Sequence, residues 1–224
     1  MTTNITEDIL IDLTAYGQRI VNNKLVAGPG GNISHRDGDL MWISPSGYSF
    51  DELSKGDWVA VDITTGETLP NQLRPSSEIA MHLEIYRSRP EINAIVHTHP
   101  PYTIGIISTE YNEIPPMFPD YVALVGKVPY IDYVVPCSDE LAQAVKKVLQ
   151  DKNYQALFLK NHGLITLGSN LKQAYVRSEI IEDAAKIFWV SKSVGTPKVL
   201  SPSDIAEISE SDAEKYRQNL MEEG

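Results

Sequence analysis

Four residues of this sequence have side chains that bind transition metals and positions that would let them meet. His97 and His99 lie two residues apart after an apolar run, and such side chains project from the same face of an extended chain. His162 follows a second apolar run at 156–159, and Glu78 begins a predicted helix. Three imidazoles and a carboxylate suit Zn²⁺, with Mn²⁺ as the alternative. A lone His-x-His pair is as easily incidental, but three elements that each end on a potential ligand favour one divalent metal.

The predicted carboxylate ligand also has the chemistry of a general base. If Glu78 leaves the ion when a substrate binds, a free carboxylate beside a Lewis acid can move a proton next to a carbonyl group. His82 lies one helical turn further on, and we expect it to orient this carboxylate rather than to bind the metal. His35 is expected on the surface of a strand. Lys160, next to His162, is expected in a structural or electrostatic role rather than as a Schiff-base nucleophile.

Three short segments have the composition of anion-binding loops. They are Gly-Pro-Gly-Gly-Asn (28–32), Ser-Pro-Ser-Gly (44–47) and Arg-Pro-Ser-Ser (74–77). The last precedes Glu78 at a predicted helix N-terminus, where unpaired N–H groups and the helix dipole favour a phosphate. Each segment has a simpler explanation, because Ser77 is a good N-cap and the glycines are good turn formers. Three such segments together with a metal-ligand set favour a phosphorylated ligand beside the metal.

Alternation and helical spacing predict the elements that must position these residues. Helices are predicted at 6–23, 77–87, 138–149 and 171–190, and strands at 32–35, 40–44, 58–63, 93–97, 156–159 and 164–167. Interleaved strands and helices predict one α/β domain over residues 1–224, with a central mixed, largely antiparallel sheet and flanking helices. The acidic tail from about residue 201 is helix-compatible, and we treat it as a candidate mobile segment.

Composition excludes several classes of protein. At 224 residues and 42% hydrophobic content the chain can bury one substantial core. It has no apolar run of the roughly 18 to 20 residues that spans a bilayer, and no secretion signal, so we expect a cytoplasmic protein without a membrane partner. A net charge of −11 argues against a nucleic-acid partner but not against a small phosphorylated one. The single cysteine, Cys137, cannot form an internal disulfide and is expected as a small buried packing residue.

Five motifs resemble, in order, those of the class II aldolase/adducin-head family over about residues 16–192. They are Gly-Gly-Asn-Ile-Ser (30–34), Ser-Pro-Ser-Gly (44–47), Pro-Ser-Ser-Glu (75–78), His-Thr-His-Pro (97–100) and Asn-His-Gly (161–163). The resemblance implies the α/β/α class II aldolase fold, one divalent metal per subunit, and a homotetramer with active sites at subunit interfaces. Carried over residue by residue, it implies a metal site of Glu78, His97, His99 and His162, and a phosphate site of Gly31, Asn32, Ser46, Gly47, Ser76 and Ser77.

The resemblance also implies a lyase reaction. A ketose 1-phosphate, of the fuculose 1-phosphate or 5-deoxypentulose 1-phosphate type, would be cleaved to dihydroxyacetone phosphate and a small aldehyde. Glu78 would handle the proton at C3, and Tyr121 or Asp120 the hydroxyl that becomes the aldehyde. The sequence before Val122 departs from the family, so both remain candidates, and Tyr216 is a candidate for the family's C-terminal tyrosine. Alternatives are a sugar-phosphate 4-epimerase, a dehydratase or a decarboxylase on the same metal site, although the family's epimerases carry aspartate in place of Glu78. A non-catalytic adducin-like module would be expected to lack the ligands.

Overall fold

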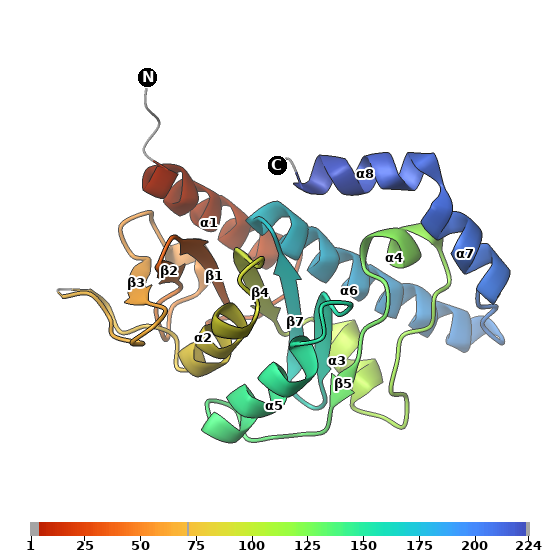
Figure 1. Ribbon diagram of the computed structural model, residues 1–224. Coiled ribbons are helices and arrows are strands. Elements are labelled where there is room, and N and C mark those ends of the chain that lie inside the picture. The colour runs from red at the N-terminus through yellow and green to blue at the C-terminus, as the bar shows by residue number, and fades with distance from the viewer. Residues whose placement is uncertain (1–4, 71, 223–224) are drawn as a thin grey trace.

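One seven-stranded sheet forms the centre of the protein (Figure 1). The computed structural model describes residues 5–70 and 72–222. The strands are β1 (Asn32–Asp37), β2 (Leu40–Ile43), β3 (Val59–Asp62), β4 (Ala94–Thr98), β5 (Tyr130–Ile131), β6 (Ala156–Leu159) and β7 (Gly163–Gly168). Their order is β3-β2-β1-β4-β7-β6-β5, and every neighbouring pair is antiparallel except β5 and β6. This confirms the predicted α/β fold with a mixed, largely antiparallel sheet.

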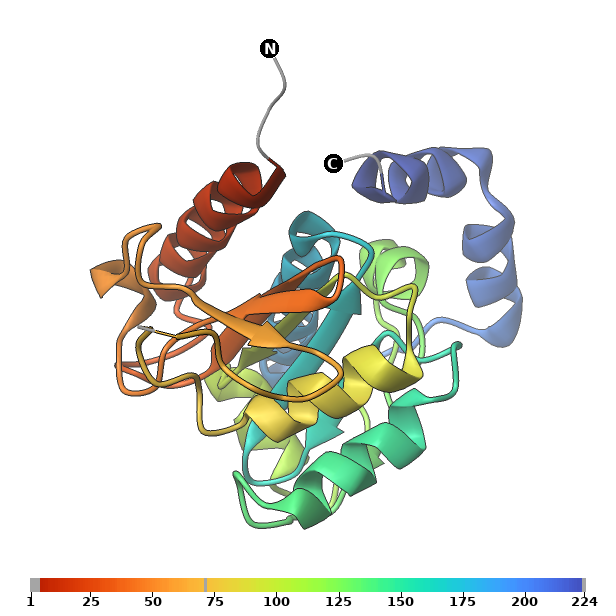
Figure 2. The same cartoon turned by 60° about the vertical axis from the view of Figure 1, so that its left-hand side comes forward.

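Helices cover both faces of this sheet. On one face lie α2 (Ile79–Ser88) and α5 (Asp139–Leu149), side by side in Figure 2. The other face carries α1 (Ile5–Asn22), α6 (Leu171–Val194), α3 (Pro101–Ile107) and α4 (Pro119–Leu124). The strands β4, β6 and β7 are buried along their whole length, which explains why their sequences are continuous apolar runs rather than alternating ones. The protein is therefore a single α/β/α domain.

Two short helices and a 3₁₀ turn were not expected from the sequence. The helices α3 and α4 each begin with a proline at the first helical position, and η1 (Phe50–Glu52) is a single turn. Proline is well suited to the first turn because it lacks the N–H that would be unpaired there. In a sequence, however, a proline is usually interpreted as the end of a helix, so short helices that begin with proline are easily missed. Of the three, α3 matters for the site because it begins two residues after His99.

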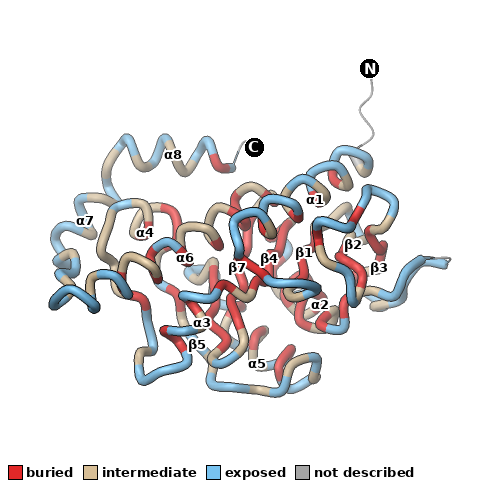
Figure 3. The backbone as a smooth tube through the Cα atoms, turned by 180° about the vertical axis from the view of Figure 1, so that it is seen from behind, coloured by how far each residue is buried: buried red, intermediate tan, exposed pale blue. Residues whose placement is uncertain are grey.

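The C-terminal tail forms two helices, α7 (Pro202–Glu210) and α8 (Asp212–Glu222). Figure 3 shows that they are largely exposed, in contrast to the buried strands. The tail is nevertheless docked: Arg217 pairs with Asp120 of α4 at 2.9 Å, and the Asn170 side chain donates to the Met221 carbonyl at 2.8 Å. The mobility of this segment stays a prediction.

Two minor predictions were wrong. Cys137 is exposed rather than buried, because it lies with a positive φ of 64° in the turn that precedes the N-cap of α5. His35 is half-buried rather than on the surface, and one of its ring nitrogens contacts the Arg36 carbonyl. Within residues 5–70 and 72–222, none of the helices combines the length and the apolar character needed to cross a membrane.

Candidate metal centre

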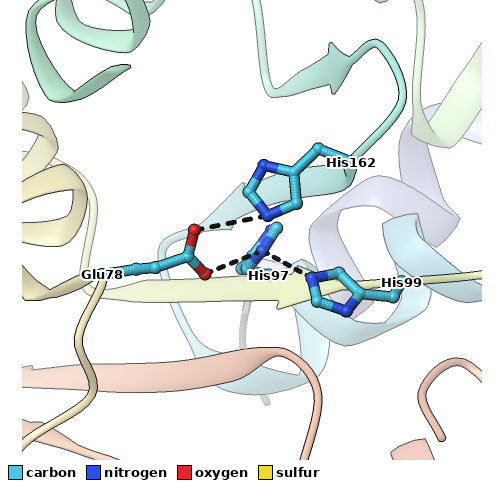
Figure 4. Close-up of side chains that lie close together, drawn as sticks. All are labelled: Glu78, His97, His99 and His162. Atoms are coloured by element: carbon cyan, nitrogen blue, oxygen red, sulfur yellow. Dashed lines mark hydrogen bonds and ion pairs between the residues drawn. The ribbon is translucent and has the colours of Figure 1, made fainter. Parts of the chain in front are cut away.

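Three elements bring the four predicted ligands together (Figure 4). His97 lies on β4 and His99 just beyond it, His162 lies in the turn between β6 and β7, and Glu78 is the N-cap residue of α2. In the register of β4 and β7, Thr98 is opposite Leu164, so His162 reaches the end of the strand that carries His97. One ligand atom from each of the four side chains lies within 4.8 Å of the others. The convergence predicted from the sequence is therefore present in the fold.

Glycines allow the two histidine-bearing segments to approach this closely. A Cβ atom on Gly163 would lie 2.5 Å from the Thr98 carbonyl oxygen and 2.9 Å from His99 Cδ2. A Cβ atom on Gly31, whose φ is +73°, would lie 2.6 Å from the His97 carbonyl oxygen. These separations are far below normal contact distances, so only glycine fits at either position. This explains the glycines in two of the sequence motifs without invoking a ligand.

The hydrogen bonds around His97 leave one of its lone pairs facing the other ligands. Its Nδ1 lies 3.0 Å from the Leu164 carbonyl oxygen, which only accepts, so Nδ1 is the donor in that contact and Nε2 is the ring nitrogen that faces the other ligands. That Nε2 is 3.1 Å from Glu78 Oε2 and 3.1 Å from His99 Nε2. Glu78 Oε1, 3.3 Å from His162 Nε2, is buried without a hydrogen-bond partner among the described residues. Such a concentration of unshared electron pairs fits a cation.

Burial and neighbouring side chains keep His99, His162 and Glu78 in the protonation states that bind metals. It lowers the pKa of His99 to about 3 and that of His162 to about 4, with the neighbouring His97 as the second cause. Burial alone would raise the pKa of Glu78, but His97, His162 and the Asn32 amide together bring it well below its usual value. At neutral pH the cluster therefore offers the neutral imidazoles of His99 and His162 and an ionised carboxylate. Its composition fits a divalent metal ion.

A pocket of about 300 Å³ joins this cluster to the segments predicted to bind phosphate. Two of those segments are held together: the Ser46 N–H donates to the Arg74 carbonyl at 2.9 Å, and the Ser76 N–H donates to the Ser44 carbonyl at 3.0 Å. Gly47 has a φ of +86°, which favours glycine. The pocket is lined by three of the ligand residues, Glu78, His99 and His162, and by the residues predicted to bind phosphate: Gly31, Asn32, Ser46, Gly47, Ser76 and Ser77.

One residue of the predicted phosphate site has its side chain committed elsewhere. Asn32 is buried, and its amide nitrogen donates to Glu78 Oε2 at 2.9 Å while its amide oxygen lies 2.5 Å from His82 Nε2. His82 thus acts on Glu78 through Asn32 rather than directly. The pocket is also lined by Pro136 and Cys137, which sequence reasoning missed because neither residue type signals a site.

The residues predicted as the second acid lie outside this pocket. Tyr121 is buried in an apolar cluster with Val125 and Phe188, and burial raises its pKa well above the usual value. Asp120 is ion-paired with Arg217. Tyr216 lies exposed on α8. Within one chain, the described structure brings none of the three to the metal cluster, so their catalytic roles stay predictions.

Comparisons with known proteins agree with this architecture. The family model described as Class II Aldolase and Adducin N-terminal domain matches residues 11–189. The chain is 35% identical to L-fuculose phosphate aldolase of Methanococcus maripaludis, covering 82% of this chain and 99% of that protein. It is 38% identical to 5-deoxy-D-ribulose 1-phosphate aldolase of Bacillus thuringiensis, covering 88% and 92%. A solved L-fuculose 1-phosphate aldolase superposes with a TM-score of 0.81 at 32% identity, covering 94% and 96%.

The chain belongs to the class II aldolase and adducin N-terminal family. It is a lyase, like the aldolases it is similar to, and it has the metal-ligand residues that a non-catalytic module was expected to lack. A more distant relative is the 3-oxo-tetronate 4-phosphate decarboxylase of Pectobacterium atrosepticum, 31% identical over 88% of this chain and 91% of that protein.

Proposed function

We propose that this protein is a metal-dependent aldolase that cleaves a ketose 1-phosphate, of the fuculose 1-phosphate or 5-deoxypentulose 1-phosphate type, to dihydroxyacetone phosphate and a small aldehyde. The observation that carries the proposal is one pocket lined by two chemically distinct sets of residues. Glu78, His99 and His162 of the metal-ligand cluster form one set, and the serine and glycine segments form the other. The names of two relatives at 35% and 38% identity support the same reaction. Phosphorylated sugars are retained inside cells, so we place the enzyme in the cytoplasm.

The phosphate lies against the serine and glycine segments of the pocket. Ser77 is exposed and lines the pocket two residues before α2, and the first N–H groups of that helix have no partner within it. Ser46, Gly47 and Gly31 supply further hydroxyl or backbone N–H groups. Ser76 has a different task, since its Oγ accepts from the Glu78 N–H at 3.3 Å and fixes the start of the helix. Asn32 contributes through its backbone, because its side chain is engaged.

The metal-ligand residues would perform the chemistry. Glu78, His97, His99 and His162 would hold one divalent ion, Zn²⁺ in preference to Mn²⁺, whose Lewis acidity would stabilise negative charge on the carbonyl oxygen. When the C3–C4 bond breaks, C3 of the dihydroxyacetone phosphate fragment gains a proton and the C4 hydroxyl loses one, so the two balance. Glu78 would deliver the first in its protonated form, and in the reverse, condensation direction the ionised Glu78 would take it from C3. A second acid–base group must take the proton of the C4 hydroxyl. Neither Tyr121 nor Asp120 lies in this pocket, so that group comes from a neighbouring copy in a homotetramer with its active sites between subunits.

A decarboxylase of keto-acid phosphates is the second candidate. The relative named 3-oxo-tetronate 4-phosphate decarboxylase favours it, and loss of carbon dioxide would leave the same kind of charge beside the metal. Epimerisation and dehydration on the same site are less favoured, since the family's epimerases have aspartate where this chain has Glu78. The four reactions give different products, which makes them separable by direct analysis.

The test is a substrate panel with matched variants. Zinc-loaded protein is incubated with fuculose, rhamnulose, 5-deoxyribulose and methylthioribulose 1-phosphates, ribulose 5-phosphate and 3-oxo-tetronate 4-phosphate, and dihydroxyacetone phosphate is read by coupled NADH oxidation. We expect release from a 6-deoxyhexulose or 5-deoxypentulose 1-phosphate, loss of turnover in Glu78→Gln, and a raised KM with unchanged zinc content in Ser77→Ala. Release of carbon dioxide without dihydroxyacetone phosphate would refute the aldolase assignment in favour of the decarboxylase.

A further inference from the structure

A ladder of buried polar side chains joins β1 to α2 and ends at Glu78. The Tyr86 hydroxyl lies 2.9 Å from Ser34 Oγ, which lies 2.7 Å from His82 Nδ1. The other ring nitrogen of His82 lies 2.5 Å from Asn32 Oδ1, and Asn32 Nδ2 donates to Glu78 Oε2 at 2.9 Å. All five residues are buried. Each link is therefore sheltered from competition by water.

The ladder forms because the repeats of the two elements match. Asn32 and Ser34 are two residues apart on β1, a distance of about 6.6 Å along a strand. Glu78, His82 and Tyr86 follow one another at intervals of four residues, a distance of about 6 Å along a helix. The strand side chains consequently fit between successive side chains of the helix, and the alternation continues from the pocket into the core.

The carboxylate at its end fixes the direction of the ladder. The Asn32 amide donates from its nitrogen to Glu78 Oε2, so its oxygen faces His82 Nε2. His82 then donates from Nε2, and its Nδ1 accepts from the Ser34 hydroxyl, which accepts in turn from Tyr86. Burial lowers the pKa of His82 to about 3, so the ring carries one proton. Burial raises the pKa of Tyr86 well above its usual value, so the phenol remains a donor.

We propose that His82 is a positioning residue for the lyase reaction: through the Asn32 amide it holds Glu78 by Oε2 and so sets the orientation of the carboxylate. The contacts of Asn32 are the reason. Its amide nitrogen donates to Glu78 Oε2 and its amide oxygen contacts His82 Nε2, and the Glu78 side chain lines the pocket. The inference rests on the proposed role of Glu78 as the base.

Losing the donor on His82 would leave the Asn32 side chain held at one end only. Its bond to Glu78 would remain, but the amide oxygen would lose the contact that holds the side chain in place. The carboxylate would then lose its fixed orientation while keeping its contacts with His97 and His162. The expected consequence is slower proton transfer with substrate binding and metal binding retained.

The kinetic test compares substitutions inside and outside the ladder. In His82→Leu we expect kcat, and the exchange of the C3 proton of dihydroxyacetone phosphate with solvent, to fall about 10- to 100-fold, with KM and zinc content near wild type. His82→Gln retains a donor for Asn32 and an acceptor for Ser34, so it should recover much of the rate. Ile85→Ala, buried on the same helix but outside the ladder, controls for lost stability and should keep the wild-type kcat.

A spectroscopic measurement on the wild-type protein tests the ladder without activity. The ring ¹⁵N shifts of His82 should show the proton on Nε2, and this reading also decides the matter if His82→Leu does not fold. A proton on Nδ1, or wild-type kcat and exchange in folded His82→Leu, would overturn the proposal, as would equal losses in His82→Leu and Ile85→Ala. If wild-type protein neither cleaves nor exchanges, the proposed function fails, and the ¹⁵N reading still tests the ladder.

Discussion

A single methyl group at Gly163 should separate the metal ligands without touching their chemistry. In Gly163→Ala the new Cβ would lie 2.5 Å from the Thr98 carbonyl oxygen, 2.9 Å from His99 Cδ2 and 3.1 Å from His97 Cε1. To restore even a tight contact of about 3 Å, the strand carrying the two histidines must move by about half an ångström relative to His162. Metal–ligand distances tolerate only about 0.2 Å. The substitution should therefore weaken metal binding.

The size of the effect follows from the cost of overpacking. Forcing an extra methyl group into a well-packed region costs about 1–3 kcal/mol. If the metal-bound state must bear that cost, the dissociation constant for zinc rises about 5- to 150-fold, since about 1.4 kcal/mol corresponds to a factor of ten. A competition titration against a chromophoric chelator measures this change, and Tm with and without EDTA shows how much stabilisation by the metal is lost.

Gly168→Ala is the matched control, at the other end of the same strand. Its Cβ would meet the Asn170 carbonyl oxygen at 2.5 Å and the Ala174 nitrogen at 2.6 Å, so it carries a similar steric cost far from the ligands. We expect both variants to lose stability in EDTA and only Gly163→Ala to lose zinc affinity. Wild-type zinc affinity in Gly163→Ala, or an equal loss in Gly168→Ala, would refute the argument that glycine is required there for close approach to the ligands.

Three further predictions concern pH, a buried arginine and the tail. Burial lowers the pKa of His99 to about 3 and that of His162 to about 4, so as the pH falls below about 6.5 these histidines take up protons in the unfolded chain before they do so in the folded one. The Tm measured in EDTA should therefore fall as the pH is lowered towards 4. A constant Tm over this range would contradict the prediction. Arg89→Leu removes the guanidinium that donates to the backbone carbonyls of Leu149, Asp151 and Tyr154, of which Asp151 keeps a bond from the Tyr154 N–H. It should lower the free energy of unfolding in urea by about 1–3 kcal/mol with zinc content unchanged. Arg217→Ala should speed tryptic cleavage of the tail. It should change the free energy of unfolding by less than about 1 kcal/mol, because the ion pair of Arg217 with Asp120 is partly exposed. An unchanged cleavage pattern would argue against a tail held by this pair.

The sequence was most informative where chemistry and local spacing coincide. His97 and His99 lie on one face of a strand because the period of an extended chain is two residues, and a short turn before β7 places His162 beside them. The sheet was predictable for the same reason, since its central strands are continuous apolar runs bounded by turn residues. Short proline-initiated helices such as α3 were missed because seven residues, about two turns, are too few to show a helical period. Cys137 was misplaced because burial in a turn depends on tertiary packing.

Predicting the partners of Glu78 requires the four-residue spacing of polar side chains on a helix and the two-residue spacing on a strand to be considered together. The sequence shows Glu78, His82 and Tyr86 four residues apart, and Asn32 and Ser34 two apart, but each pattern alone is unremarkable. They become one ladder only because β1 is paired with β4, with Asn32 opposite His97, which turns Asn32 and Ser34 towards the face covered by α2. Burying a polar residue at every fourth position of a helix costs free energy, and so does burying polar residues at alternate positions of a strand. The cost is offset only when the two sets of side chains form hydrogen bonds with each other. That matched spacing is therefore a sequence signal for residues that position a catalytic carboxylate, and it can be sought before a structure is known.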